Sequence, residues 1–341
     1  MRMQIQLQGA CRYTLAPMRG SLMKSISCLF VLLTLTSYAN AQRPDRELLP
    51  LNAYALEGYA AVDVSESFTL PAGFEFERVS SIGINSLNNM LVLHRGEDPL
   101  LEFDAQGNYL RAFGPRDTWT FSHGLRLDAQ NNIWVTDIGT HIVMKMDTDG
   151  NILQTLGTAG ENGLWDEASG SHKFDQPNDI AFDSEGNFYI AQGHGNGEPR
   201  ILKFDSDGNF IKQWGSRGAG PGQFAVAHSI EIDNDDMLYV ADRENFRIQI
   251  FDTEGNYTGE WKFSAMACAL YFHDDGYMYM TSGFDGEWAK VDMEGSIVGA
   301  LGRPGSANGE FGEGHFLTVN NQGDVYIADV VNRRVQLYQK Q

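Results

Sequence analysis

Apolar and polar residues alternate in short segments along this chain, and the same order of segments returns at intervals of roughly 40 residues. Each copy has an alternating segment that ends in Asp or Asn, then segments such as "LYVAD" (238–242) and "RIQIF" (247–251), and a fourth segment after a glycine turn. Alternation with a period of two predicts half-buried β-strands, and helical periodicity is absent. The pattern therefore predicts an all-β protein with four short strands in each repeat.

Six copies of this pattern occupy most of the chain. They cover residues 79–114, 121–157, 174–215, 224–262, 266–302 and 311–338. Turns such as "DTDGN" (147–151) and "DSDGN" (205–209) join the third and fourth strands, because Gly permits a positive φ and Asp or Asn binds the local backbone. Four strands in each of six repeats predict a six-bladed β-propeller.

The sixth copy ends after three strands, so its outer strand has to come from another part of the chain. A strand-like segment, "FEFERV" (74–79), precedes the first copy. We expect this N-terminal strand to complete the last blade and close the ring, which leaves no long unpaired edge.

Residues 1–41 have the pattern of an export signal. Arg19 and Lys24 precede the apolar run "ISCLFVLLTL" (26–35), and the small residues "ANA" (39–41) suit a cleavage site. No other apolar run is long enough to span a bilayer. The pattern predicts a periplasmic or secreted protein without a membrane-spanning segment.

We expect residues 42–70 to lead into the ring and residues 71–341 to form a single propeller domain. The first 41 residues hold four basic and no acidic side chains, so their removal would change the net charge from −20 to −24. This excess of negative charge argues against nucleic acid or an anionic membrane as a partner. Cys268 is the one cysteine after residue 41, which excludes an internal disulfide, and no feature indicates an oligomeric state.

One position, at the head of the innermost strand, differs between alternate copies. In chain order it holds Ser80, His123, Asn178, His228, Cys268 and His315. Alternate blades of a six-bladed ring are related by about 120°, so the three imidazoles would surround the central channel. Three neutral imidazoles and an open position are typical of catalytic Zn²⁺. We interpret the three histidines as metal ligands, although any one alone would more simply bond a neighbouring carbonyl.

The repeats resemble those of known propellers. The phrases "RIQIF" and "ADRENFR" (241–247) resemble the NHL-repeat family. More specifically, "SHGLRLDAQNNIWVTD" (122–137), "PGQFAVAHSIEI" (221–232) and "HRGED" (94–98) are similar to the lyase domain of peptide α-amidating enzymes, the peptidyl-α-hydroxyglycine α-amidating lyases. This resemblance implies a six-bladed propeller with a zinc ion held by three histidines in its channel.

The resemblance also implies roles for particular residues. His123, His228 and His315 match the zinc ligands, Arg95 the catalytic arginine, and Arg243 a second active-site arginine. The family cleaves the C–N bond of a peptidyl-α-hydroxyglycine and releases an amide and glyoxylate. Zinc makes the α-hydroxyl easier to deprotonate, and a guanidinium can bind a carboxylate through two hydrogen bonds. The implied substrate is therefore a small molecule or peptide that carries a carboxylate.

The chain departs from the family at two places. The phrase "QGH" stands where the family has "DGY", so His194 replaces the tyrosine proposed as the base. If His194 acts as the base, the reaction rate should fall below roughly pH 6.5 unless the environment shifts the pKa of its imidazole. Its imidazole could instead bind the metal. Near the third zinc ligand, Phe316 replaces the aspartate that binds the family's Ca²⁺, and Glu313 could either take over that calcium site or act as an added acid near the metal.

Three functions remain open from the sequence. The first is an exported zinc-dependent lyase that acts on α-hydroxyglycine-type carbinolamides. The second keeps the zinc but hydrolyses an ester or lactone, because a bound metal can also activate water. The third is a non-catalytic NHL propeller that binds a protein or glycan. The substitution at His194 keeps the second function open, whereas the three histidines and two arginines argue against the third.

Overall fold

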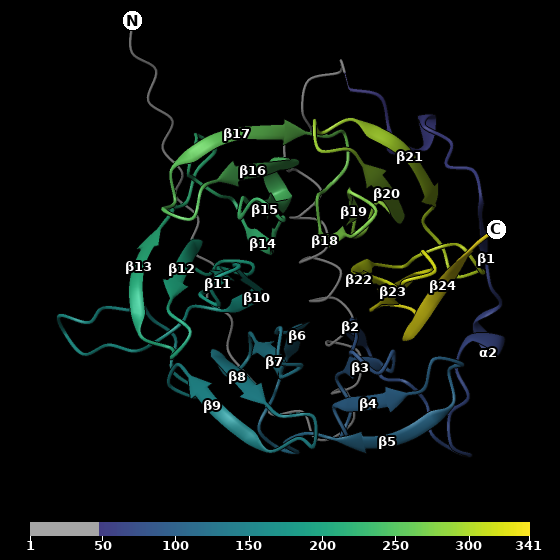
Figure 1. Ribbon diagram of the computed structural model, residues 1–341, viewed down its shortest axis with the longest axis horizontal. Coiled ribbons are helices and arrows are strands. Elements are labelled where there is room, and N and C mark those ends of the chain that lie inside the picture. The colour runs from purple at the N-terminus through teal and green to yellow at the C-terminus, as the bar shows by residue number, and fades with distance from the viewer. Residues whose placement is uncertain (1–47) are drawn as a thin grey trace, which may run out of the picture. The chain divides into compact units, whose positions relative to one another are not determined.

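The computed structural model describes residues 48–341, which form a ring of six four-stranded antiparallel sheets (Figure 1). This confirms the predicted all-β, six-bladed propeller. The innermost strands surround the centre of the ring. They are β2 (Val79–Ile84), β6 (Ser122–Leu127), β10 (Pro177–Phe182), β14 (Ala227–Ile232), β18 (Ala269–His273) and β22 (Gly314–Val319).

The other strands follow outward in chain order within each blade. The second strands are β3 (Met90–His94), β7 (Ile133–Asp137), β11 (Phe188–Gln192), β15 (Leu238–Asp242), β19 (Tyr277–Thr281) and β23 (Val325–Asp329). The third strands are β4 (Leu100–Phe103), β8 (Ile142–Met146), β12 (Arg200–Phe204), β16 (Arg247–Phe251), β20 (Glu287–Val291) and β24 (Arg334–Lys340). The outer strands are β5 (Tyr109–Phe113), β9 (Ile152–Leu156), β13 (Phe210–Trp214), β17 (Tyr257–Lys262), β21 (Ile297–Gly302) and, for the last blade, β1 (Tyr59–Ala61).

An N-terminal strand closes the ring, but it is not the segment expected from the sequence. The strand β1 pairs antiparallel with β24, with Tyr59 opposite Lys340. Residues 74–78 form no strand. Their apolar side chains pack instead: Phe76 lies 6.0 Å from Phe103 between ring centroids, in the cluster that joins the first and last blades. The alternation in "FEFERV" therefore came from burial of phenylalanines and not from sheet pairing.

Little of the described chain is helical. The helical segments are η1 (Leu51–Ala53), α2 (Val64–Ser67) and η2 (Arg243–Asn245). No helix of the described residues is long and apolar enough to cross a membrane. The predicted export signal, residues 1–41, lies outside the described residues and stays a prediction. The strand β1 lies within the segment expected to lead into the ring, so part of that segment belongs to the last blade.

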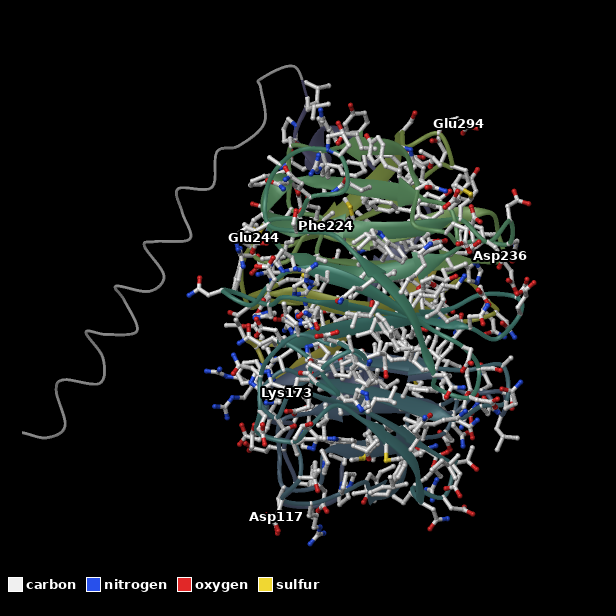
Figure 2. The ribbon with its side chains drawn as sticks, turned by 90° about the vertical axis from the view of Figure 1, so that its left-hand side faces the viewer. Asp117, Lys173, Phe224, Asp236, Glu244 and Glu294 are labelled. Atoms are coloured by element: carbon white, nitrogen blue, oxygen red, sulfur yellow. The ribbon has the colours of Figure 1, made fainter. Side chains whose placement is uncertain are left out.

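Apolar faces of neighbouring blades meet in separate clusters. Between the second and third blades, for example, Trp134 packs against Phe188 with ring centroids 4.8 Å apart, and Phe188 stacks on Phe204. Seen edge-on, the ring has two faces: Glu244 and Lys173 lie on one, and Asp236 lies on the other (Figure 2). Because the blades form the rigid frame, side chains at strand heads are held at fixed positions around the channel.

Candidate metal centre

Three buried histidines lie together at the centre of the ring. His123 is on β6, His228 on β14 and His315 on β22, the innermost strands of alternate blades. Their ring centroids are 4.8 Å (His123 to His228), 4.6 Å (His123 to His315) and 5.1 Å (His228 to His315) apart. The repeat spacing therefore brings three imidazoles from distant parts of the chain to one place.

The intervening blades orient these imidazoles through their backbone carbonyls. Each Nδ1 lies at hydrogen-bond distance from the carbonyl oxygen of the strand-head residue in the next blade: His123 from Asn178 at 2.8 Å, His228 from Cys268 at 2.8 Å, and His315 from Ser80 at 2.6 Å. A carbonyl oxygen can only accept, so Nδ1 carries the hydrogen and Nε2 keeps its lone pair. The second, fourth and sixth blades thus supply the imidazoles, and the third, fifth and first blades supply the carbonyl oxygens that orient them.

The residues present fit a metal ion. The Nε2 atoms of His123 and His228 are buried and have no hydrogen-bond partner among the described residues. A buried acceptor without a partner is costly, and a cation would satisfy it. Burial lowers the pKa of His123 and His228 well below 6.5, and that of His315 to about 3, so all three imidazoles are neutral at neutral pH. Neutral imidazole nitrogens suit Zn²⁺ and related divalent ions.

A fourth imidazole, that of His194, faces the same place. It follows β11 in the third blade, and its ring centroid lies 5.0 Å from that of His123 and 5.6 Å from that of His228. Burial, followed by the positive charge of Arg243, lowers its pKa well below 6.5. His194 is therefore neutral near neutral pH and has a nitrogen lone pair to offer to a proton or a metal.

Arg95 lies after β3 with its guanidinium on the face of the Phe121 ring, 3.6 Å from the centroid. Its Nε donates to the carbonyl oxygen of Ser122 at 3.1 Å. Its terminal nitrogens make no hydrogen bond to any residue between 48 and 341. Burial lowers the pKa of Arg95 to about 10, so it remains a cation at neutral pH. Arg95 thus offers a fixed guanidinium to an anion.

Arg243 differs from Arg95 because a carboxylate already binds it. It begins η2 and is 6% exposed, and its Nε and Nη2 donate to Glu244 Oε1 at 2.8 and 2.6 Å. Although burial opposes its charge, Glu244 raises its pKa above the ordinary value. We therefore expect Arg243 to contribute less than Arg95 to binding a substrate anion, a difference the sequence did not show.

Comparisons with known proteins agree with this architecture. A family model described as a 6-bladed beta-propeller matches residues 194–322. NHL repeat-containing protein 3 of Homo sapiens is 29% identical over 287 residues, which cover 75% of this chain and 78% of that protein. The chain is a six-bladed propeller that is similar in sequence to an NHL-repeat protein.

Other relatives of this chain carry enzyme names. Peptidyl-glycine alpha-amidating monooxygenase A of Xenopus laevis is 30% identical over 292 residues, covering 74% of this chain but 30% of that protein. A probable peptidyl-alpha-hydroxyglycine alpha-amidating lyase of Caenorhabditis elegans is 38% identical over 141 residues, covering 40% of this chain and 39% of that protein. The chain thus spans about a third of these relatives' length.

Among solved structures, a gluconolactonase from Xanthomonas campestris superposes with a TM-score of 0.62 at 12% identity, covering 88% of this chain and 99% of that one. At this identity the likeness shows the fold alone. The six-bladed propeller fold is thus shared by proteins with several named activities, so the function depends on the residues of the site.

Phe316 packs against the imidazoles of the candidate metal centre. It is buried, with its ring centroid 5.0 Å from that of His315 and 5.6 Å from that of His123. The Phe316 side chain has no oxygen, so it cannot supply the carboxylate that binds calcium in the amidating lyases that the sequence resembles. Glu313, beside His315 in sequence, is partly buried, and burial raises the pKa of its carboxyl although Arg243 and Arg95 oppose this. The three imidazoles thus have an aromatic ring and several charged groups near them.

Sequence reasoning missed a second polar group, which lies near the Phe316 ring. Arg126 on β6 lies with its guanidinium 5.5 Å from the Phe316 ring and pairs with Asp179 and Glu231. Arg126 and Glu231 line a cavity of about 460 Å³ that also includes Asp236, on the face opposite Glu244 (Figure 2). Charged residues within otherwise apolar inner strands were the signal that could have revealed this group.

Proposed function

We propose that this propeller is an exported, zinc-dependent carbon–nitrogen lyase that cleaves carbinolamides of the peptidyl-α-hydroxyglycine type into an amide and glyoxylate. The observation that carries the proposal is the group of three neutral imidazoles whose Nδ1 atoms are each held by a carbonyl. The nearby guanidinium of Arg95 and the relatives named amidating lyases support it.

His123, His228 and His315 would hold the metal through Nε2. When bound, zinc would lower the pKa of the substrate α-hydroxyl. Arg95 would bind the substrate carboxylate with its terminal nitrogens, and Arg243, already paired with Glu244, would add positive charge nearby. Arg95 would thus select a substrate with a carboxylate next to the reacting carbon.

Bond cleavage requires two proton movements. His194 would accept the hydroxyl proton, and the hydroxyl oxygen would become the aldehyde oxygen of glyoxylate as the C–N bond breaks. The bonding electron pair moves to the amide nitrogen, which has to gain a proton. Glu313 is the candidate donor, because burial raises the pKa of its carboxyl and keeps it closer to the protonated form than an exposed glutamate.

The test of this function is glyoxylate release from an N-acyl-α-hydroxyglycine. We expect the purified protein to release glyoxylate and the matching amide in equal amounts when loaded with zinc. After removal of the metal by a chelator the rate should fall to background, and added zinc should restore it. A zinc-loaded protein that releases no glyoxylate above the spontaneous rate would refute the proposal.

The pH dependence tests the role of His194. The sequence alone predicts a loss of rate below roughly pH 6.5. Burial lowers the pKa of His194 well below this, and the base is active when neutral, so the rate is lost only as the pH falls through the lowered pKa. We expect kcat/KM to stay constant through about pH 6.5. A decline centred near 6.5, or an unchanged profile in His194→Gln, would contradict this role.

The second candidate is a metal-dependent lactonase on the same site. It is favoured by the imidazole of His194, since a neutral imidazole could also take a proton from an attacking water. The two activities differ in their products. A lactonase would open a lactone in a zinc-dependent manner and release no glyoxylate from the α-hydroxyglycine substrate.

A further inference from the structure

The metal centre contains one nitrogen donor more than the three strand-head histidines. We propose that His194 is a fourth ligand of the metal in the substrate-free protein, so that the resting centre holds four imidazoles. This inference rests on the metal centre of the proposed function. The candidate ligand atoms of His123, His194 and His228 all lie within 4.8 Å of one another, so a small approach of the rings would bring all three nitrogens to the distance of about 2.0–2.1 Å that zinc requires.

The loop that carries His194 is held in place by its backbone. The Gly193 N–H donates to the carbonyl oxygen of Asp175 at 3.0 Å, and the Gly197 N–H donates to that of His194 at 2.9 Å. Gly193 has a φ of 103°, and a Cβ there would lie 2.5 Å from the Cα of Pro199, so only glycine fits. The backbone of this loop thus fixes the point from which the His194 side chain reaches toward the centre.

The ring of His194 itself has no competing partner. Within residues 48–341, neither of its nitrogens makes a hydrogen bond, whereas each of the three strand-head histidines uses Nδ1 to bind a carbonyl. A neutral imidazole that is fixed in position and faces two metal-ligand rings has its lone pair available to the same ion. Nothing in the protein has to break for His194 to bind it.

Cys268 is the other donor near the centre, and its position favours His194. The Sγ atom lies 3.8 Å from His228 Nδ1, the nitrogen that bonds to the carbonyl of Cys268. Nδ1 and Nε2 lie on different sides of the ring, so the thiol is near the side that carries the hydrogen. The ligand atoms of His228, Cys268 and His315 also lie within 4.8 Å of one another, so the Cys268 thiol is the alternative fourth donor that a count of imidazoles distinguishes from His194.

A fourth ligand changes how the proposed base would act. A ring nitrogen that binds the metal cannot accept a proton at the same time. The substrate would have to displace His194, and the released imidazole would then lie beside the substrate hydroxyl. One residue would thus protect the metal in the resting protein and serve as the base after substrate binds.

The experiment counts imidazoles by X-ray absorption at the zinc edge. We expect four imidazoles in the zinc-loaded protein and three in both His194→Gln and His194→Ala. The control is His172→Gln, which removes an imidazole that stacks on Trp165 in the loop between β9 and β10. This variant should still show four imidazoles bound to zinc. In chelator competition, zinc should dissociate with a Kd at least about tenfold weaker in the His194 variants than in the control.

The outcomes separate this inference from the proposed function. Three imidazoles in the unsubstituted protein, or an unchanged zinc Kd in both His194 variants, would overturn the inference and leave the lyase open. Four imidazoles in a protein that releases no glyoxylate would support the inference and refute the lyase. A protein that binds no zinc would refute both.

Discussion

His228→Ala is expected to lose its bound zinc and to lower glyoxylate release by at least about a thousandfold, because a metal that lowers a hydroxyl pKa contributes several kcal/mol to the reaction. The fold should persist. The His228 ring lies among the other imidazoles at the centre, and its Nδ1 bonds to the Cys268 carbonyl at 2.8 Å with the Cys268 Sγ at 3.8 Å. Loss of such a bond costs about 1 kcal/mol.

The matched control is His273→Ala. His273 ends β18, another inner strand, and its Nε2 lies 3.2 Å from the carbonyl oxygen of Asn320. Its removal deletes an imidazole and a comparable carbonyl contact, but it lies outside the metal centre. We expect the control to keep one zinc per chain and the full rate. Full zinc occupancy in His228→Ala, measured by elemental analysis after dialysis, would show that the three-histidine centre is wrong.

The sequence predicted the frame of this protein because the frame depends on local patterns. Strand alternation and glycine turns recur in every blade, so six repeats could be counted and the position of each strand head assigned. The spacing then placed His123, His228 and His315 on alternate blades, and the structure brings their rings within 5.1 Å of one another. Because each repeat forms one blade, residues at the same repeat position occupy equivalent places around the ring.

Features that depend on contacts between distant segments were missed or misassigned. The closing strand is three residues long, too short to show alternation, whereas Phe74 and Phe76 imitate a strand because they pack against blade residues. The carbonyls that orient the histidines are also invisible in a sequence, since every residue has one. Likewise, only the fold reveals that the guanidinium of Arg243 is hydrogen-bonded to the Glu244 carboxylate, whereas that of Arg95 has no carboxylate partner among the described residues.

The charged group around Arg126 joins four blades. Arg126 on β6 binds Asp179 of β10 with both ends of its guanidinium, at 3.0 and 2.8 Å. It also pairs with Glu231 of β14 at 3.1 Å and donates to the carbonyl oxygen of Leu270 on β18 at 2.9 Å. Asp179 is fully buried and Arg126 nearly so. The Arg126 guanidinium thus connects the inner strands of four blades.

Arg126→Met should destabilise the propeller by about 3–5 kcal/mol, because it leaves two carboxylates near the core without their cation. The control, Arg116→Met, removes an exposed guanidinium that pairs with Asp98 and should cost no more than about 1 kcal/mol. Chemical denaturation of both variants would measure the difference. Equal losses in the two would mean that the buried group contributes no more than a surface ion pair.

The loss in Arg126→Met should also depend on pH. Burial raises the pKa of Glu231 to about 7, although Arg126 opposes this rise. A carboxyl with a raised pKa binds more protons in the folded than in the unfolded state, so stability falls as the pH rises from its unfolded pKa through its folded pKa. Without Arg126 the folded pKa of Glu231 rises further. The variant should therefore lose more stability relative to the parent at pH 8 than at pH 6, and an equal loss at both would contradict this coupling.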